Sequence, residues 1–397
     1  MSYQYLPGFE PDFDVKQELR FIGGMPDLHQ FDYVYISCSG GKDSHAMAYI
    51  LSELATMQNY DKNKMELIYA DTGLEWHDTF EQVKRIGNAV NIKAVKVLPK
   101  YKLLDNVRRR WAKFNGLPDD WQNGNEGVGR QTDRQTDSTP AGKTEVWHPH
   151  SRTSPSGSAT AITSEIRSSS MSVSEPRSYV LPQLGKDISS GAVYQSKVRG
   201  GGRDSWNRPF PSQFAKFCTA WGKQAPIEQY TRQSVPLQSS EILHWRKQEQ
   251  CNSRESTARE QSGGRLGSIR ILMCSGERRE ESSKRATYPE WSIHEALTTK
   301  KRRTYRWRPM LDYKVADVWS MVKDSGIEAH EAYQLGCDRL GCTMCIFAGE
   351  CGRMAKDVKI ACRENPEQYE ELDKLEMDTG FTMSIQGVRI RDIVKKA

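Results

Sequence analysis

Short apolar runs alternate along the chain with longer stretches in which apolar residues recur at helical spacing. The runs predict strands over 31–37, 65–71, 93–98 and 269–275. The spaced stretches predict helices over 44–59, 77–90, 101–114, 224–232 and 314–325. Because strands that alternate with helices usually form a sheet covered on both faces, we expect an α/β fold with a doubly wound, mostly parallel sheet.

Two stretches, 121–205 and 238–267, interrupt this pattern with polar residues and few apolar ones. Such segments cannot bury enough apolar surface to form a core, so we predict a flexible polar insertion and a shorter polar insertion. The predicted organisation is an α/β core over 1–120, the insertion over 121–205, the rest of the core over 206–328 and a C-terminal region over 329–397.

The composition agrees with an apolar core interrupted by polar segments. Only 37% of the 397 residues are hydrophobic and the mean hydropathy is −0.72, which is low for a compact enzyme. Apolar runs stay well short of the roughly 18 residues that span a bilayer, and the first residues lack the basic-then-apolar layout of a signal peptide. We therefore predict a soluble, cytoplasmic protein with no membrane partner.

Charge and cysteine content point to anionic partners and to thiol or metal chemistry. The formal net charge is +6, and basic residues cluster at 108–110 and 300–303. Such clusters suit a nucleotide or a nucleic acid, although solvated helix faces or loop ends are an equally good interpretation. Nine cysteines without a secretion signal favour metal binding or reactive thiols over a disulfide scaffold.

The most informative segment is Ser-Cys-Ser-Gly-Gly-Lys-Asp-Ser at 37–44, which lies between a predicted strand and a predicted helix. Glycines there can aim successive backbone N–H groups at one anion, and the helix start favours negative charge. The candidate phosphate-binding residues are Ser37, Ser39, Gly40, Gly41, Lys42, Asp43 and Ser44. The spacing differs from that of the Walker A loop.

A second candidate segment follows the next strand, where Asp71, Thr72, Gly73 and Glu75 would reach the same sheet edge. Open α/β sheets bind ligands at the carboxyl ends of their strands. These residues are therefore candidate nucleotide contacts, and for Asp71 a helix N-cap is the alternative.

Both segments resemble known families. The 39–44 loop is similar to the SGGxDS loop (PP-loop) of ATP pyrophosphatases, and 71–75 resembles the DTGLE stretch of the phosphoadenosine phosphosulfate (PAPS) reductase family. The resemblance covers most of the chain outside the insertions. It implies an adenine nucleotide alpha hydrolase-like, Rossmann-like fold that binds ATP, or PAPS or adenylyl sulfate (APS), with Mg²⁺. Asp71 and Glu75 then become candidates for ribose, adenine-side or Mg²⁺ contacts.

Two further elements resemble the same family. In the first, a Cys-Thr element is followed by a lysine, and Cys218 and Lys223 stand at these positions. In the second, G-x-R-x-x-E-S-x-x-R, Arg278 and Arg285 stand at the two arginine positions. Lys223 could neutralise a phosphate or sulfate, and the two guanidinium groups could clamp phosphate oxygens. We predict Lys42, Asp43, Lys223 and Arg278 as the catalytic residues.

The C-terminal region contains Cys337, Cys342 and Cys345, which are spaced closely enough to converge on one centre. A tetrahedral site needs a fourth ligand, and relatives with iron–sulfur clusters pair an upstream cysteine with a downstream Cys-x2-Cys. That comparison favours Cys218, with Cys351 as the local alternative. We predict a [4Fe–4S] cluster, with Zn²⁺ or unligated, redox-active thiols as alternatives.

The signatures of sulfonucleotide reductases are incomplete, because the chain has neither an ECGLH element nor a Cys-Cys pair at 218. The layout is more similar to the sulfur-transfer subunit of DNA phosphorothioation systems. That resemblance implies adenylylation of a DNA phosphate oxygen and replacement by sulfur. Implied partners are DNA or RNA and a cysteine desulfurase or another sulfur or electron donor. Sulfonucleotide reduction and a non-enzymatic nucleotide- or nucleic-acid-binding module stay open as alternatives.

Overall fold

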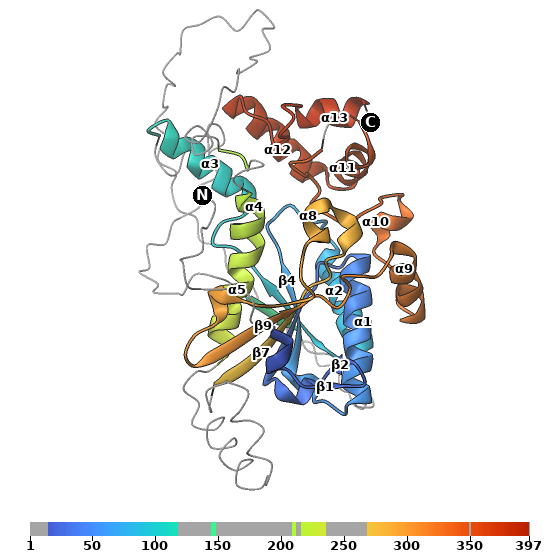
Figure 1. Cartoon of the computed structure of the whole chain (residues 1–397). Helices are drawn as coiled ribbons and strands as arrows, with labels where there is room; N and C mark the ends of the chain where they lie inside the picture. The colour runs from blue at the N-terminus through green and yellow to red at the C-terminus, as the bar shows by residue number, and fades with distance from the viewer. Residues whose placement is uncertain are drawn as a thin grey trace, which may run out of the picture.

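The fold is built on a seven-stranded sheet in the order β6-β5-β4-β3-β7-β9-β8 (Figure 1). The computed structural model describes residues 15–117, 144–147, 209–211, 216–235, 268–348 and 351–396. The sheet strands are β3 (Tyr33–Ser37), β4 (Met65–Ala70), β5 (Lys93–Val97), β6 (Thr144–Trp147), β7 (Ile269–Cys274), β8 (Trp291–Ile293) and β9 (Arg302–Trp307). A separate small hairpin pairs β1 (Phe21–Ile22) with β2 (Met25–Pro26).

The five central strands run parallel, and each edge strand, β6 and β8, pairs antiparallel with its neighbour. The chain builds β3, β4 and β5 outward in one direction, then returns to add β7 and β9 on the other side of β3. The strand order therefore reverses between β3 and β7, which is where open α/β sheets bind ligands. This confirms the predicted α/β, Rossmann-like fold class.

Helices cover both faces of the sheet, as the alternation of elements predicts. The longer helices are α1 (Lys42–Met57), α2 (Thr79–Val90), α3 (Leu103–Phe114), α5 (Ala225–Ser234), α9 (Val315–Asp324), α11 (Arg353–Glu364), α12 (Pro366–Thr379) and α13 (Ile390–Lys396). Short turns of helix are α4 (Phe217–Thr219), α8 (Ser283–Ala286) and α10 (Glu331–Gln334).

The period-two alternation of each strand divides the sheet core into two clusters. On β3, Val34 and Ile36 pack with α1, α2 and α9, whereas Tyr35 faces the other side and packs with α5. Successive side chains of a strand point to opposite faces, so both faces of this central strand are buried. The same division holds on β4, where Leu67 and Ile68 belong to different clusters.

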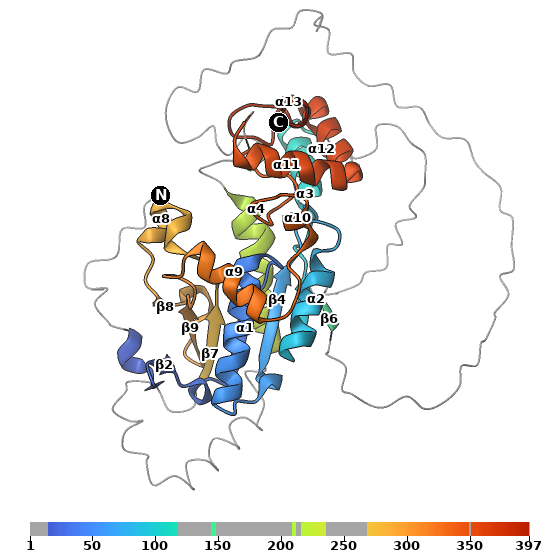
Figure 2. The same ribbon diagram turned by 90° about the vertical axis from the view of Figure 1, so that its right-hand side faces the viewer.

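The C-terminal helices α11, α12 and α13 form a separate apolar cluster with α3, above the carboxyl edge of the sheet (Figures 1 and 2). Polar contacts join the C-terminal region to the segment after β4 and to α3. The backbone N–H of Thr343 donates to Leu74 O at 2.7 Å, and Gln368 Nε2 donates to Glu75 O at 3.0 Å. Arg108 of α3 also forms an ion pair with Glu371 of α12. This region is therefore fixed directly over the segment that follows β4.

The sequence did not predict the strands β1, β2, β6, β8 and β9, and two of these bear on other predictions. Thr144–Trp147 lies inside the predicted 121–205 insertion, yet it forms β6 against β5, and most of that insertion lies outside the described residues, as does 238–267. The basic cluster at 300–303 enters β9, which we did not predict. Arg302 there is buried and donates from Nε to Leu297 O at 2.6 Å, so it serves the sheet rather than an external anion.

No helix in the described parts of the chain combines the length and apolar character that crossing a bilayer requires.

Candidate nucleotide site and neighbouring thiols

The 39–44 loop joins β3 to α1 at the point where the strand order reverses. Gly40 has φ +74°, a conformation that favours glycine, and a Cβ there would lie 3.1 Å from Thr79 Cγ2, so the space beside it is also tight. Ser44 Oγ accepts the backbone N–H of Ser39 at 3.1 Å and donates to Gly41 O at 3.0 Å. The predicted glycine turn is thus held in shape by the serine that follows it, while Ser37 ends β3.

Lys42 and Asp43 begin α1 and lie in a buried set of charges. Only 5% of Lys42 is exposed, and its Nζ lies 3.2 Å from Asp43 Oδ2. The other carboxylate oxygen of Asp43 accepts from Arg278 Nε at 2.5 Å, and Arg278 is 4% exposed. The structure therefore brings together three of the four predicted catalytic residues. Two cations share one carboxylate beside the 39–44 loop.

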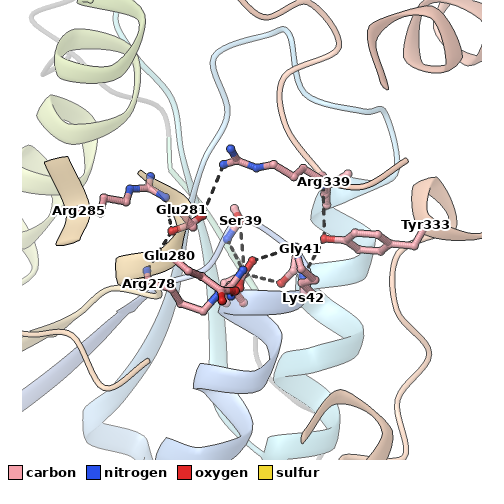
Figure 3. Close-up of polar contacts among 12 residues, drawn as sticks. Ser39, Gly41, Lys42, Arg278, Glu280, Glu281, Arg285, Tyr333 and Arg339 are labelled. Atoms are coloured by element: carbon pink, nitrogen blue, oxygen red, sulfur yellow. Dashed lines mark hydrogen bonds and ion pairs between the residues drawn. The ribbon is translucent and has the colours of Figure 1, made fainter. Parts of the chain in front are cut away.

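The segment after β7 also contacts the loop, as Figure 3 shows. A Cβ on Gly276 would lie 3.2 Å from Asp43 O, so the segment approaches α1 closely. Beyond it, Arg278 also pairs with Glu280, and Arg285 pairs with Glu281. Both predicted phosphate clamps are thus already bound to carboxylates, and a nucleotide would have to share or replace these partners.

Residues before the cysteines reach over the same loop. Tyr333 Oη accepts the backbone N–H of Lys42 at 2.9 Å and that of Leu340 at 3.4 Å. Leu340 lies against the glycine pair, since its side chain would be 3.5 Å from a Cβ on either glycine. Arg339 extends across the loop toward Glu281, at 3.7 Å (Figure 3). Neither Tyr333 nor Leu340 was predicted to be a site residue.

The residues that follow β4 form a second polar group. Thr72 donates its backbone N–H and its hydroxyl to the Glu75 carboxylate, at 2.7 and 2.8 Å. Asp71 accepts the N–H of Gly73 at 2.8 Å and lies 3.3 Å from Lys96 Nζ of β5. Burial and the charge of Glu75 raise the pKa of Asp71. Asp71 therefore closes a local turn and has a cationic neighbour, and it is not a helix N-cap, since α2 begins only after Asp78.

Lys223 links this group to the cysteines. It lies in a π-helical turn, Ala220–Gln224, a feature that is frequent at functional sites, and its Nζ is 3.0 Å from Glu75 Oε1. Cys342 Sγ lies 3.7 Å from the same oxygen and also hydrogen-bonds to Lys223. Burial alone would raise the pKa of Glu75, but the charge of Lys223 and hydrogen bonds from Lys223 and Thr72 hold it below its usual value.

Three of the predicted cysteine ligands are neighbours. Cys345 and Cys218 lie close enough to Cys342 to raise the pKa of its thiol, and Cys218 likewise raises the pKa of Cys345. Burial raises the pKa of the Cys342 thiol to about 12, although Lys223 opposes the shift, and burial also raises the pKa of Cys345. In this arrangement the two thiols are protonated at neutral pH, so activation as nucleophiles would require a change in their surroundings.

Cys337 is not part of this group. It packs in a separate apolar cluster with Trp76, Ala332 and Ala361, and its Sγ lies 3.9 Å from Asp357 O. The local alternative, Cys351, is exposed. Within the described segments, no group of three or more His, Cys, Asp or Glu side chains converges tightly enough to hold a metal ion. The residues as placed do not fit a four-thiolate cluster, because Cys337 packs in a different apolar cluster despite its close spacing to Cys342 and Cys345.

A known protein domain matches the part of the chain that includes Lys223, Arg278, Tyr333 and the Cys-x2-Cys pair. Residues 222–348 match the phosphoadenosine phosphosulfate reductase domain. The matching stretch begins after the 39–44 loop and extends through Cys345. Its presence supports a nucleotide-related enzyme with a role in sulfur transfer or reduction.

A curated relative is similar over a shorter stretch. It is an uncharacterized 37.8 kDa protein of Escherichia phage 186, which is 37% identical over 78 residues. That stretch is 20% of this chain, and the chain spans 22% of the relative's length.

Proposed function

We propose that this protein binds ATP through the 39–44 loop and transfers the adenylyl group to an acceptor oxyanion. The observation that supports this most strongly is the glycine pair of that loop, at the point between β3 and β7 where the strand order reverses. Loops of this kind bind phosphate through backbone N–H groups and the helix dipole. The PAPS reductase domain at 222–348 contributes Arg278 to the same site.

In the proposed reaction, an acceptor oxygen attacks the α-phosphorus, the bond to the bridging oxygen of the β-phosphate breaks, and pyrophosphate leaves. Such chemistry depends on positioning and charge neutralisation rather than on a nucleophilic side chain. Lys42 and Arg278 would supply positive charge, and Asp43 would hold both of them in place. Mg²⁺ would bind the phosphates with help from Asp71 or Asp43.

A sulfide-level sulfur of the donor would then attack the phosphorus of the adenylylated acceptor, the bond from that phosphorus to the oxygen that carries the adenylyl group would break, and AMP would leave. We propose a DNA or RNA phosphate as the acceptor class, with a cysteine desulfurase or another sulfur donor as partner. Lys223 would lie between the two parts of the site, because it contacts both Glu75 and Cys342. A [4Fe–4S] cluster or Zn²⁺ at the cysteines stays a prediction, and none of the steps above depends on it.

The test is ATP titration of the full chain, followed by exchange of labelled pyrophosphate into ATP with and without DNA or RNA oligonucleotides. We expect ATP binding and acceptor-dependent exchange, both lost or strongly weakened in Lys42→Ala. Absence of ATP binding in the parent protein would refute the proposal. Oligonucleotide affinity without turnover would instead favour a binding module.

Sulfonucleotide reduction is the second candidate, favoured by the thiols beside Lys223 within a PAPS reductase domain. Two thiols would supply two electrons and become a disulfide, while sulfite and the nucleotide phosphate leave. Release of sulfite from PAPS or APS, with one disulfide formed per turnover unless an external dithiol is added, would distinguish this reaction from adenylyl transfer.

A further inference from the structure

Tyr333 lies beside the 39–44 loop, and the proposed reaction assigns it no role. Its ring projects toward the start of α1, where Oη accepts the N–H of Lys42 at 2.9 Å (Figure 3). The same oxygen accepts the N–H of Leu340 at 3.4 Å. One phenol oxygen therefore joins the first turn of the loop helix to the segment that leads to Cys342.

The hydrogen-bonding capacity of this phenol is only partly used. A tyrosine hydroxyl has two acceptor lone pairs and one donor hydrogen. Both acceptor positions are taken by the backbone N–H groups of Lys42 and Leu340. Among the described residues, no side chain or carbonyl accepts the hydroxyl hydrogen of Tyr333, so that hydrogen is available to a ligand.

The ring is held firmly in this orientation. Trp319 packs against it edge-on, with ring centroids 5.0 Å apart and planes at 84°. Lys42 Nζ lies over its face, 5.7 Å from the ring centroid. Burial raises the pKa of Tyr333 to about 12, so the hydroxyl keeps its hydrogen throughout the physiological range.

We propose that Tyr333 is a phosphate-binding residue whose hydroxyl donates to an oxygen of the nucleotide bound at the 39–44 loop. This inference rests on the proposed nucleotide binding and deepens it, because it adds a ligand contact from the C-terminal half of the chain. The two acceptor contacts stay in place and fix the Lys42 amide and Leu340 relative to each other. Since Leu340 precedes Cys342 by two residues, the same tyrosine connects the phosphates to the thiol-bearing segment.

The test compares Tyr333→Phe with the parent and with Tyr313→Phe, which removes a hydroxyl from a phenol that is 37% exposed. Each protein is titrated with ATP and with adenosine, which has no phosphate. A hydrogen bond to a charged group corresponds to about a 10- to 100-fold change in affinity. We expect Tyr333→Phe to weaken ATP binding by that factor, with little change for adenosine, and Tyr313→Phe to bind both ligands as the parent does.

Equal ATP affinity in the parent and in Tyr333→Phe would overturn the inference and leave the proposed function intact. An equal loss for ATP and adenosine would also overturn it, because a merely structural role would explain that result. If the parent does not bind ATP, both the proposed function and this inference fail.

A second measurement uses a substitution that retains the hydroxyl and its contacts, so the fold should be unchanged. A ring-fluorinated tyrosine in place of Tyr333 lowers the pKa of the phenol, so we expect ATP affinity to fall as pH rises through that lowered pKa, while the parent shows no such step. A pH profile identical to that of the parent would contradict a donor role for Tyr333.

Discussion

The 39–44 loop and the cysteine region lie at the same edge of the fold, but they are built in different ways. The loop is one contiguous segment whose shape is set by Gly40 and by the contacts of Ser44 with its own neighbours. Cys218 is distant in sequence from Cys342 and Cys345, and the three thiols become neighbours because the C-terminal region packs over the end of β4. Local sequence therefore specifies the first site, whereas tertiary packing specifies the second.

The charges also differ between the two regions. At the loop, Lys42 and Arg278 both contact Asp43, and Arg278 also pairs with Glu280. Near the thiols, Lys223 compensates Glu75, and burial keeps Cys342 protonated. An anion at the loop would therefore have to share or replace these carboxylate partners, whereas burial holds the thiols in the protonated, less nucleophilic form.

The largest expected effect is at the loop. In Arg278→Ala, Asp43 and Glu280 lose a buried cation, and breaking such a pair costs about 3–5 kcal/mol. We expect urea denaturation to show a loss of that order together with loss of ATP binding. The exposed Arg339→Ala, which removes a weak contact to Glu281, should cost less than about 1 kcal/mol. Similar losses in the two variants would contradict the buried charge set.

The next effect is in the C-terminal region. Glu376 of α12 is 1% exposed, and burial raises the pKa of its carboxyl to about 7. Its folded form therefore holds a proton that the unfolded chain releases near pH 4.5, so stability should fall as pH rises from about 4.5 to 7. The neutral Glu376→Gln should lack this loss, which amounts to about 3 kcal/mol.

The measurement for Glu376 is the free energy of unfolding of the parent and of Glu376→Gln across this pH range. Glu370→Gln, at an exposed position of the same helix, serves as the control and should follow the parent. Parallel profiles for the parent and Glu376→Gln would contradict a raised pKa.

A smaller effect is expected where the two regions meet. Lys223→Met leaves the buried Glu75 without its cation, which should cost about 1–3 kcal/mol at neutral pH. The lowered pKa of Glu75 gives stability that is present above about pH 4.5 and lost on acidification, so the deficit of the variant should shrink at lower pH. In a double-mutant cycle, adding Glu75→Gln should recover part of the loss. Additive losses would show that the pair does not interact.

The smallest effect is expected at Cys337. Its thiol is a small buried hydrophobe in a cluster separate from the other cysteines, so Cys337→Ser should cost about 1 kcal/mol and leave the iron, zinc and sulfide content of anaerobically purified protein unchanged. Cys342→Ser is the matched comparison. Equal loss of metal in the two variants would make Cys337 a ligand and contradict its separate placement.

Sequence patterns were sufficient for the parts of the fold with a regular period. The strands β3, β4, β5 and β7 and the helices α1, α2, α3, α5 and α9 were predicted, because apolar residues there follow the periods of strands and helices. The strand β9 was missed, since Arg302, Arg303 and Arg306 hide its alternation behind a basic composition. In the structure, Arg302 is buried and Arg303 pairs with Glu18 of a distant turn.

The residues of the candidate site likewise include some that the sequence could predict and some that it could not. The loop residues and Arg278 could be found from contiguous motifs, and the structure brings them together. Tyr333 could not be identified by its type, because a tyrosine three residues before a glycine has no distinctive chemistry on its own. Its position became informative only when packing placed its hydroxyl on the N–H of Lys42.

The most direct test of the account is calorimetric titration of the full chain with Mg²⁺-ATP, compared with Lys42→Ala and with the exposed Lys113→Ala. The account predicts that the parent and Lys113→Ala bind ATP equally. Lys42→Ala should bind it at least about tenfold more weakly, since one charge-assisted contact is lost. An ATP affinity that is unmeasurable in the parent, or the same in all three proteins, would contradict the central claim that the 39–44 loop binds the nucleotide.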